Sequence, residues 1–407
     1  MVIKLDKIFD SANNNKIFKN KFVLQTNYTP DTIPHRDKEI EQIASILAPC
    51  LKGERTSNLF VYGKTGTGKT LSVHYVKNEL LNRAKKNSAV SLRIEYLNCK
   101  LKKIADTEYR ILAELIKKLG GNVPATGLPT DQVYNRFIEL VEREKQLLVL
   151  ILDEVDQAVK KISDNFLYNL TRLNSELDRA QISIVGISND LRFLDNLDPR
   201  VRSSLSEEEI IFPPYNALQL QDILRSRAER AFCKGCIAEG VIEKCAAFAA
   251  REHGDARRAL DLLRVAGEIA ERKTESKIRL SHIDLANNKI ERDKILDVIE
   301  SEPKQFQLVL LAILQLHESC YLKSARQQKI FTGDVYREYQ ELCRKTNTEI
   351  LTQRRLSSII SEFDMLGLIN AKNISRGSYG KTKEIKSAIP DQIFEKSKFI
   401  LKDSLGL

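Results

Sequence analysis

The chain has 407 residues, of which 42% are hydrophobic and 29% are charged, with a formal net charge of +10 and a pI near 9.1. This length exceeds one simple core and predicts two or three domains, and no apolar run is long enough to cross a bilayer. The basic balance favours a polyanionic partner, and the first residues lack the apolar core of a secretory signal, so we expect a cytoplasmic protein with no membrane partner.

Short apolar runs alternate with amphipathic helical patterns in the first half of the chain. We predict buried parallel strands over residues 58–63, 92–97, 147–154 and 182–189. Strands that alternate with helices form a doubly wound α/β domain, which we place at residues 1–215. The stretch "FPPY" ends this pattern. Residues 216–295 then predict an all-α domain, and residues 296–407 predict three helices followed by a β-hairpin.

The stretch "GKTGTGKT" fits the pattern G-x-x-x-x-G-K-[ST] between a predicted strand and a predicted helix. Its glycines let backbone N–H groups close around phosphate oxygens, while Lys69 offers a positive charge and Thr70 a hydroxyl for Mg²⁺. A chance glycine-rich turn is the alternative, which the flanking elements disfavour. The predicted contacts of this segment to ATP or ADP are Gly63, Lys64, Thr65, Gly66, Thr67, Gly68, Lys69, Thr70 and Leu71.

The second half of a nucleotide site follows in "LLVLILDEVD". Asp153 ends the buried strand, where its carboxylate can hold Mg²⁺, and Glu154 can act as the general base for an attacking water. Asp156 belongs to the following turn. Because a kinase-type P-loop enzyme does not need this glutamate, the order Asp-Glu predicts an ATP hydrolase.

Further polar residues stand where a motor-type ATPase uses them. Asn189 ends a predicted strand, from which its amide can bridge the γ-phosphate and the attacking water. Arg200 and Arg202 both precede the last strand, and Arg257 opens a helix of the second domain. Each arginine is a candidate to stabilise charge in the transition state. Strand-end asparagines and surface arginines are also common without such a role.

The C-terminal domain predicts a DNA-binding helix. In the third predicted helix, "TQRRLSSIISEFDMLGLI", Thr352 is the expected N-cap. Helical spacing puts Leu356, Ile359, Ile360 and Phe363 on one face, and it points Arg354, Ser358 and Ser361 away from them, with Arg355 on the flank. An apolar back and an Arg/Ser front are typical of a helix-turn-helix motif.

Two predicted strands around "SRGSYGKTK" form a wing. Lys381 and Lys383 are expected to contact phosphates, and Arg376 is expected to enter a minor groove. A winged helix that binds protein is the alternative. The predicted DNA contacts of this domain are Arg354, Arg355, Ser358, Arg376, Gly377, Tyr379, Lys381 and Lys383.

The seven cysteines are scattered, and their odd number predicts reduced thiols. Cys233 and Cys236 in "CKGC" have the spacing of half a zinc site. No second pair follows at a suitable distance, so thiols are favoured over a metal site.

Together these motifs resemble the AAA+ superfamily. The stretches "YTPDTIPHRDKEI", "DPRVRSSLSEEEIIFPPYN" and "GDARRALDLLR" closely resemble archaeal replication initiators, relatives of the eukaryotic origin-recognition and cell-division-cycle proteins, and the resemblance covers nearly the whole chain. It implies that Asn27 to Arg36, especially His35 and Arg36, fall in the segment that lines the adenine pocket, with Tyr215 also at the nucleotide. It further implies that Arg200, with Arg202 as the second choice, reaches a neighbouring subunit's nucleotide, and that Arg257 senses the γ-phosphate from the lid.

The same resemblance implies that residues 100–122 are the initiator-specific helical insertion, which touches DNA. Lys102 and Lys103 are the expected contacts, and a buried stripe is expected from Ile111, Leu112, Leu115, Ile116 and Leu119. A solvated helix face is the alternative for the basic residues.

The expected protein is therefore an ATP-dependent initiator that binds duplex origin DNA and acts at the nucleoid. Its expected partners are other initiator protomers or paralogues and the replicative helicase, which it helps to load. Two alternatives remain: a clamp-loader-like or helicase-loader-like ATPase, and a DNA-binding regulator that is switched by nucleotide without turnover.

Overall fold

The computed structural model of the chain describes residues 17–86, 91–100, 107–124, 127–205, 207–322, 329–375 and 381–407. It divides into two compact units, of which the first ends at Ile283 and the second begins at Asp284. Within the described ranges no helix is both long and apolar enough to cross a membrane.

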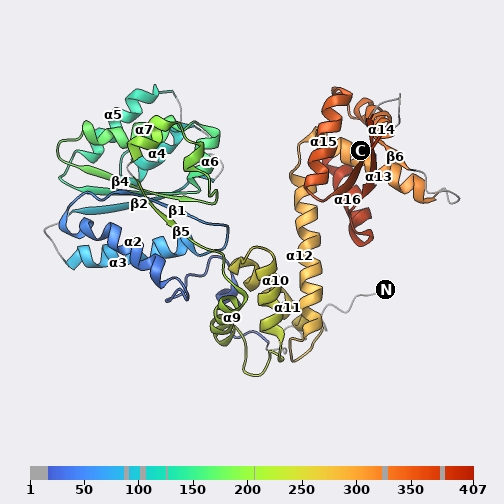
Figure 1. Cartoon of the computed structure of the whole chain (residues 1–407), viewed down its shortest axis with the longest axis horizontal. Helices are drawn as coiled ribbons and strands as arrows, with labels where there is room; N and C mark the ends of the chain where they lie inside the picture. Colours follow the sequence, from blue (N-terminus) through green and yellow to red (C-terminus); the bar gives the residue numbers. More distant parts are fainter. Residues whose placement is uncertain are drawn as a thin grey trace. The chain divides into compact units, whose positions relative to one another are not determined.

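A parallel sheet forms the centre of the first unit (Figure 1). In the described part of the chain its strand order is β2-β3-β4-β1-β5, and neighbouring strands are parallel. The register pairs Asn98 with Asp153 and Tyr62 with Ser188, so the carboxyl ends of four strands meet at one edge. The strands are β1 (Asn58–Tyr62), β2 (Leu92–Asn98), β3 (Leu147–Asp153), β4 (Gln181–Ser188) and β5 (Glu207–Ile211).

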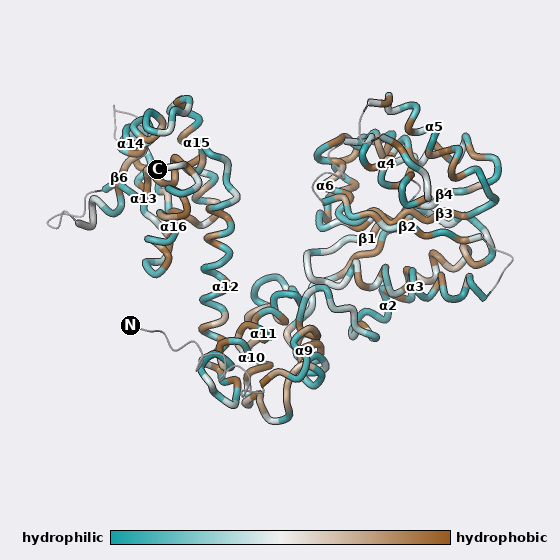
Figure 2. The backbone as a smooth tube through the Cα atoms, turned by 180° about the vertical axis from the view of Figure 1, so that it is seen from behind, coloured by the Kyte–Doolittle hydropathy of each residue, from teal (hydrophilic) through white to brown (hydrophobic). Residues whose placement is uncertain are grey.

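Helices cover both faces of this sheet (Figure 1). Successive strand residues alternate between the two cores: Leu59 and Val61 pack on one side, and Phe60 and Tyr62 pack on the other. Figure 2 shows the apolar strands enclosed between the two helical layers. One layer holds α2 (Asp37–Leu47) and α3 (Lys69–Lys86); the other holds α4 (Glu108–Lys118), α5 (Thr130–Val141), α6 (Val155–Lys161), α7 (Asn165–Arg172) and α8 (Pro199–Leu205). The predicted α/β architecture is confirmed, and the predicted apolar stripe on α4 is buried.

A helical lid follows the sheet in the first unit. It contains α9 (Ala217–Ala231), α10 (Val241–Arg251), α11 (Ala256–Arg272) and the start of α12 (Leu280–Ser301). Asn216 and Gln219 form a capping box at the start of α9, and the Asp255 carboxylate accepts two backbone N–H bonds at the start of α11.

The segment from residue 17 to residue 35, called the strap below, lies against this lid. It includes a short 3-10 helix, Lys21–Leu24. The ring of Phe18 lies 4.8 Å from that of Phe232 between ring centres, and Lys21 forms a 2.7 Å ion pair with Glu268.

The second unit is a winged helix. Its helices are α13 (Lys304–Leu322), α14 (Thr332–Lys345), α15 (Gln353–Met365) and α16 (Asp391–Leu405), and its antiparallel sheet has the order β6-β8-β7, from Ile330–Phe331, Lys381–Ser387 and Ile369–Ser375. Thr352 caps α15 as predicted, and Gly367, with φ of +71°, follows its end.

Three features of this region differ from the sequence prediction. Strand β6 and helix α16 were not predicted. Helix α12 runs without a break from Leu280 to Ser301, so the expected boundary between residues 295 and 296 falls inside it. A two-residue strand carries too little pattern to detect, and α12 has no glycine or proline that would mark its middle. The positions of the domain boundaries stay predictions.

Candidate functional site

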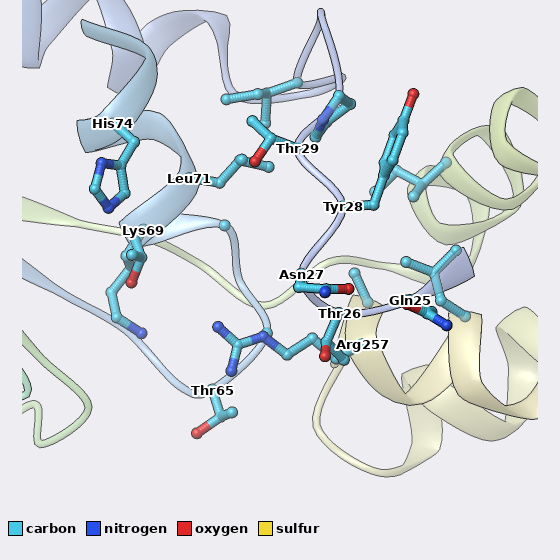
Figure 3. A pocket seen from close by; sticks show the side chains of 18 of the residues that line it. Gln25, Thr26, Asn27, Tyr28, Thr29, Thr65, Lys69, Leu71, His74 and Arg257 are labelled. Atoms are coloured by element: carbon cyan, nitrogen blue, oxygen red, sulfur yellow. The ribbon is translucent and has the colours of Figure 1, made fainter. Parts of the chain in front are cut away.

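A cavity of about 590 Å³ lies at the carboxyl edge of the parallel sheet (Figure 3). Its walls come from the strap, the P-loop, the first turns of α3, the ends of β2, β3 and β4, and the lid. Sequence-predicted residues that line it are Thr65, Gly66, Gly68, Lys69, Thr70, Leu71, Asp153, Glu154, Asn189, Tyr215 and Arg257. Motifs that are nearly 200 residues apart in the sequence therefore meet at one cavity.

Lys69 is held by three oxygen acceptors. Its Nζ donates to the carbonyl oxygens of Gly63 at 2.6 Å and Lys64 at 2.8 Å, and to Oδ1 of Asn189 at 2.9 Å. The side chain is buried, and this burial lowers the pKa of Lys69 to about 8, although the nearby Asp153 carboxylate opposes the shift. Because β4 lies beside β1, Asn189, the residue after β4, reaches Lys69 of the P-loop, which follows β1.

We expect nucleotide affinity to fall as the pH rises through about 8, because phosphate oxygens bind the charged form of Lys69. Above that pH, Lys69 should take up a proton from solution when ADP binds. Calorimetric titrations in two buffers with different ionisation enthalpies should show this uptake at about pH 8.5 and little of it near pH 7. A Lys69→Arg variant keeps its charge and should show no such uptake; an equal uptake in that variant would exclude Lys69 as its source.

The Asp153 carboxylate is buried and accepts hydrogen bonds at both oxygens. Oδ2 accepts from the Thr70 hydroxyl at 3.0 Å and from the Tyr96 hydroxyl at 2.8 Å, and Oδ1 accepts from the backbone N–H of Glu154 at 2.9 Å. Burial and the Asp153 charge raise the pKa of Tyr96, so its hydroxyl stays protonated as a donor. The sequence analysis did not identify Tyr96 as a site residue. Tyr96 lies two residues before Asn98, the residue of β2 that pairs with Asp153.

Glu154 stands at the start of α6 with a left-handed backbone, φ of +54°, which is uncommon for a residue with a side chain. Its Oε2 lies 3.5 Å from Nζ of Lys100. Both residues line the cavity, so the predicted general base lies beside a cation that sequence reasoning did not assign to it.

The lid touches the P-loop directly. The backbone N–H of Ala256 donates to the carbonyl oxygen of Gly66 at 3.3 Å, and a Cβ atom at Gly66 would lie 1.7 Å from Oδ1 of Asp255. Only glycine fits this contact, since Gly66 also has φ of +74°. Figure 3 shows the guanidinium of Arg257 extending into the cavity on the side of Lys69 and Thr65.

Five predicted nucleotide contacts are not among the residues that line the cavity: His35, Arg36, Gly63, Lys64 and Thr67. Nε2 of His35 lies within hydrogen-bond distance, 3.0 Å, of Oδ2 of Asp222 in the lid, and the hydroxyl of Thr67 donates back to the Lys64 carbonyl. The strap residues that do form a wall precede His35, from Gln25 to Pro34.

Arg36 lies behind the P-loop, where its side chain is 1% exposed. Its Nε donates to the carbonyl oxygen of Thr67 at 2.9 Å, while the other guanidinium nitrogens donate to Glu39 and to the carbonyl oxygen of Pro213. The guanidinium also lies 4.0 Å from the ring centre of Tyr215. Arg36 therefore supports the loop from outside the cavity and does not line it, because these carbonyl groups use its donors.

Arg200 lies away from the cavity of its own chain. Its side chain is 84% exposed, and a two-point contact with Asp198 holds it, from Nε at 3.1 Å and from Nη2 at 3.2 Å. Arg202 pairs with Asp195 at 3.1 Å. The exposed position of Arg200 suits a side chain that serves another subunit, and both roles stay predictions.

The face of α15 that was predicted to contact DNA is exposed on the winged helix. Arg354, Arg355 and Ser358 are exposed, whereas Leu356, Ile359, Ile360 and Phe363 are fully buried on the opposite side. Arg355 also lies 3.6 Å from Glu362.

Lys383, which was predicted to contact phosphate, joins the wing to this helix. Its Nζ donates to the carbonyl oxygen of Ser357 at 3.2 Å and to the hydroxyl of Ser361. Its ammonium group therefore faces α15, and its contact with a DNA phosphate stays a prediction. Five other predicted DNA contacts, at Lys102, Lys103, Arg376, Gly377 and Tyr379, lie outside the described residues, as does the side chain of Lys381.

The cysteines show no metal centre in the part of the chain that the structure describes. No group of three or more His, Cys, Asp or Glu side chains gathers there as ligands, and the described cysteines form no disulfide.

The sheet, the P-loop cavity and the lid define a AAA+ ATPase. Family models match three successive stretches of the chain: a AAA domain over residues 52–194, a Cdc6 AAA+ ATPase-type lid domain over residues 221–288, and a CDC6 C-terminal winged helix domain over residues 297–397.

Curated relatives match almost the whole chain. The ORC1-type DNA replication protein of Pyrococcus furiosus is 52% identical over 389 residues, which cover 94% of this chain and 90% of that protein. The ORC1-type DNA replication protein 1 of Methanosarcina mazei is 47% identical over 387 residues, covering 95% and 91%. A solved structure of the Aeropyrum pernix ORC1 protein in complex with DNA has a TM-score of 0.81 and 43% identity, covering 96% of this chain and 98% of that one.

The chain belongs to the family of ORC1-type DNA replication proteins. It is thus an ATPase of DNA replication initiation, and the predicted family, fold class and activity are confirmed.

Proposed function

We propose that the chain binds duplex origin DNA through its winged helix and that ATP bound at the P-loop cavity controls its assembly with other initiator protomers. This control leads to recruitment of the replicative helicase at the nucleoid in the cytoplasm. The observation that carries the DNA-binding part is the exposed Arg354, Arg355 and Ser358 face of α15 over a fully buried apolar face. The 43% identical Aeropyrum pernix ORC1 protein, whose structure was solved in complex with DNA, supports DNA binding by this chain.

The residues at the cavity suit ATP with Mg²⁺. The Thr70 hydroxyl and the Asp153 carboxylate are hard oxygen donors within 3.0 Å of each other, which is the donor set that Mg²⁺ accepts together with phosphate oxygens. When bound, the ion would neutralise charge that develops on the phosphates. Lys69 and Arg257 would supply further positive charge, and Asn189 and Glu154 would orient and deprotonate the attacking water.

Arg257 and Arg200 are proposed to act on the nucleotides of different protomers. Arg257 lines the cavity of its own chain, while Arg200 does not. Turnover in a lone protomer should therefore be slow, since a second protomer has to supply Arg200.

Replacing Arg354 by alanine should weaken binding of an origin duplex about fivefold or more, because the substitution removes a cation that contacts either a base or a phosphate. Fluorescence anisotropy at several salt concentrations separates these cases: removal of a phosphate contact lowers the salt slope by about one unit, and removal of a base contact reduces discrimination between duplexes. Lys402→Ala removes an exposed cation from α16 and serves as the matched control.

If Arg354→Ala and Lys402→Ala bind DNA alike, with equal salt slopes, the assignment of α15 as the reading helix is wrong. The double variant Arg376→Ala and Lys381→Ala tests the predicted wing in the same way. Sequencing the fragments that the protein retains at physiological salt, with ATP and with ADP, would identify the DNA site and its dependence on nucleotide.

A further inference from the structure

Tyr96 of β2 donates a hydrogen bond to the buried carboxylate of Asp153. The hydroxyl lies 2.8 Å from Oδ2, the same oxygen that accepts from Thr70. Among the donors that the described residues offer to Asp153, Thr70 and Glu154 belong to the two nucleotide motifs. Tyr96 comes from a third element and is part of neither motif.

The fold fixes the position of the Tyr96 ring. The register of β2 and β3 pairs Tyr96 with Ile151 and Asn98 with Asp153. Tyr96 therefore lies two residues before the position opposite Asp153, on the same face of the sheet. On the other side the ring packs against His74, with ring centres 4.5 Å apart and an angle of 48° between the planes. His74 follows Thr70 by four residues on α3 and therefore lies on the same face of that helix.

A carboxylate in such a buried place has few alternative orientations that satisfy both oxygens. The Glu154 N–H holds Oδ1, and the Tyr96 hydroxyl directs Oδ2 toward the edge of the cavity, where Thr70 lies. Outer hydrogen-bond partners of this kind orient metal ligands in proteins, and their loss commonly lowers metal affinity by one or two orders of magnitude.

We propose that Tyr96 is a positioning residue for the divalent cation that accompanies the nucleotide. Its hydroxyl fixes the Asp153 carboxylate in the orientation in which this group and Thr70 hold the ion together. This inference rests on the proposed function, since it takes Asp153 and Thr70 as the cation ligands.

The test is the affinity of the ADP-bound full chain for Mn²⁺, measured from the electron paramagnetic resonance signal of the free ion. Tyr96→Phe keeps the ring that packs on His74 and removes only the hydroxyl. We expect this variant to bind Mn²⁺ about tenfold more weakly, while its affinity for ADP in EDTA stays within about twofold of the unsubstituted protein.

Tyr62→Phe is the matched control. Tyr62 lies on β1 of the same sheet, and its buried hydroxyl has no hydrogen-bond partner among the described residues, so its removal should leave Mn²⁺ affinity unchanged. Asp153→Asn tests the underlying site and should weaken Mn²⁺ binding more than Tyr96→Phe does.

The outcomes separate the two levels of the proposal. If Asp153→Asn leaves Mn²⁺ affinity unchanged, the proposed cation site itself is wrong. If Asp153→Asn weakens binding but Tyr96→Phe does not, only the role of Tyr96 is wrong. If Tyr96→Phe weakens ADP binding equally in EDTA, the tyrosine shapes the nucleotide cavity in general, and the positioning role is overturned.

Discussion

Replacing Glu154 by glutamine should lower ATP turnover about 100-fold or more and leave the protein loaded with ATP. The amide keeps the shape of the side chain but cannot accept a proton from water, and general-base catalysis contributes roughly 100- to 10,000-fold. ATP affinity should not fall, because the substitution breaks the ion pair with Lys100 and leaves the hydrogen bonds of Lys69 and Thr70 in place.

Single-turnover hydrolysis and the nucleotide content after gel filtration measure these two effects. Glu144→Gln, at an exposed position before β3, is the matched control and should hydrolyse ATP like the unsubstituted protein. If Glu154→Gln also hydrolyses ATP at the original rate, Glu154 is not the base. A protein that binds DNA equally well before and after this substitution, with no turnover in either form, would be a nucleotide-switched regulator.

Replacing Arg36 by alanine should destabilise the first unit by about 3 kcal/mol, because the substitution leaves Glu39 and two carbonyl groups without their buried donor. For a unit of this size, that loss corresponds to a fall of about 5 °C in its thermal midpoint. Nucleotide affinity should fall as well, since the Thr67 carbonyl that Arg36 holds belongs to the P-loop.

Differential scanning calorimetry of the full chain measures the shift, and the transition of the winged helix is an internal reference. Arg83→Ala is the control, because Arg83 forms an exposed i,i+4 pair with Glu79 that should contribute under about 0.5 kcal/mol. Equal midpoints for the two variants would show that the Arg36 contacts contribute no more than a surface pair.

Local patterns were enough to predict the sheet and the two nucleotide motifs. Buried parallel strands are continuous apolar runs, and the P-loop needs glycines at fixed spacing, so both are visible in a short window. The buried face of α15 was predicted in the same way, from 3.6-residue spacing and an N-cap at Thr352.

Contacts that depend on tertiary geometry were not visible. Tyr96 and Lys100 look like ordinary strand and loop residues until the β2–β3 register brings them to Asp153 and Glu154. Arg36 was placed at the nucleotide by the family resemblance, and Lys383 was placed at DNA because it lies in a basic wing; the structure adds the protein carbonyl groups that each of them contacts. Whether a cationic side chain contacts a ligand or a protein carbonyl depends on the distance to each group in the folded chain. The sequence alone does not give these distances.

The strap also determines how the cavity can open. The strap forms part of the cavity wall between Gln25 and Pro34. It is attached to the lid through Phe18 on Phe232, Lys21 with Glu268 and Asp31 with Arg230. His35 makes a further contact with Asp222 of the lid, and the next residue, Arg36, is bound to the P-loop. We therefore expect the lid and the strap to move as one rigid body, with the hinge near Arg36. One such motion would expose the base and the phosphates of a bound nucleotide at the same time.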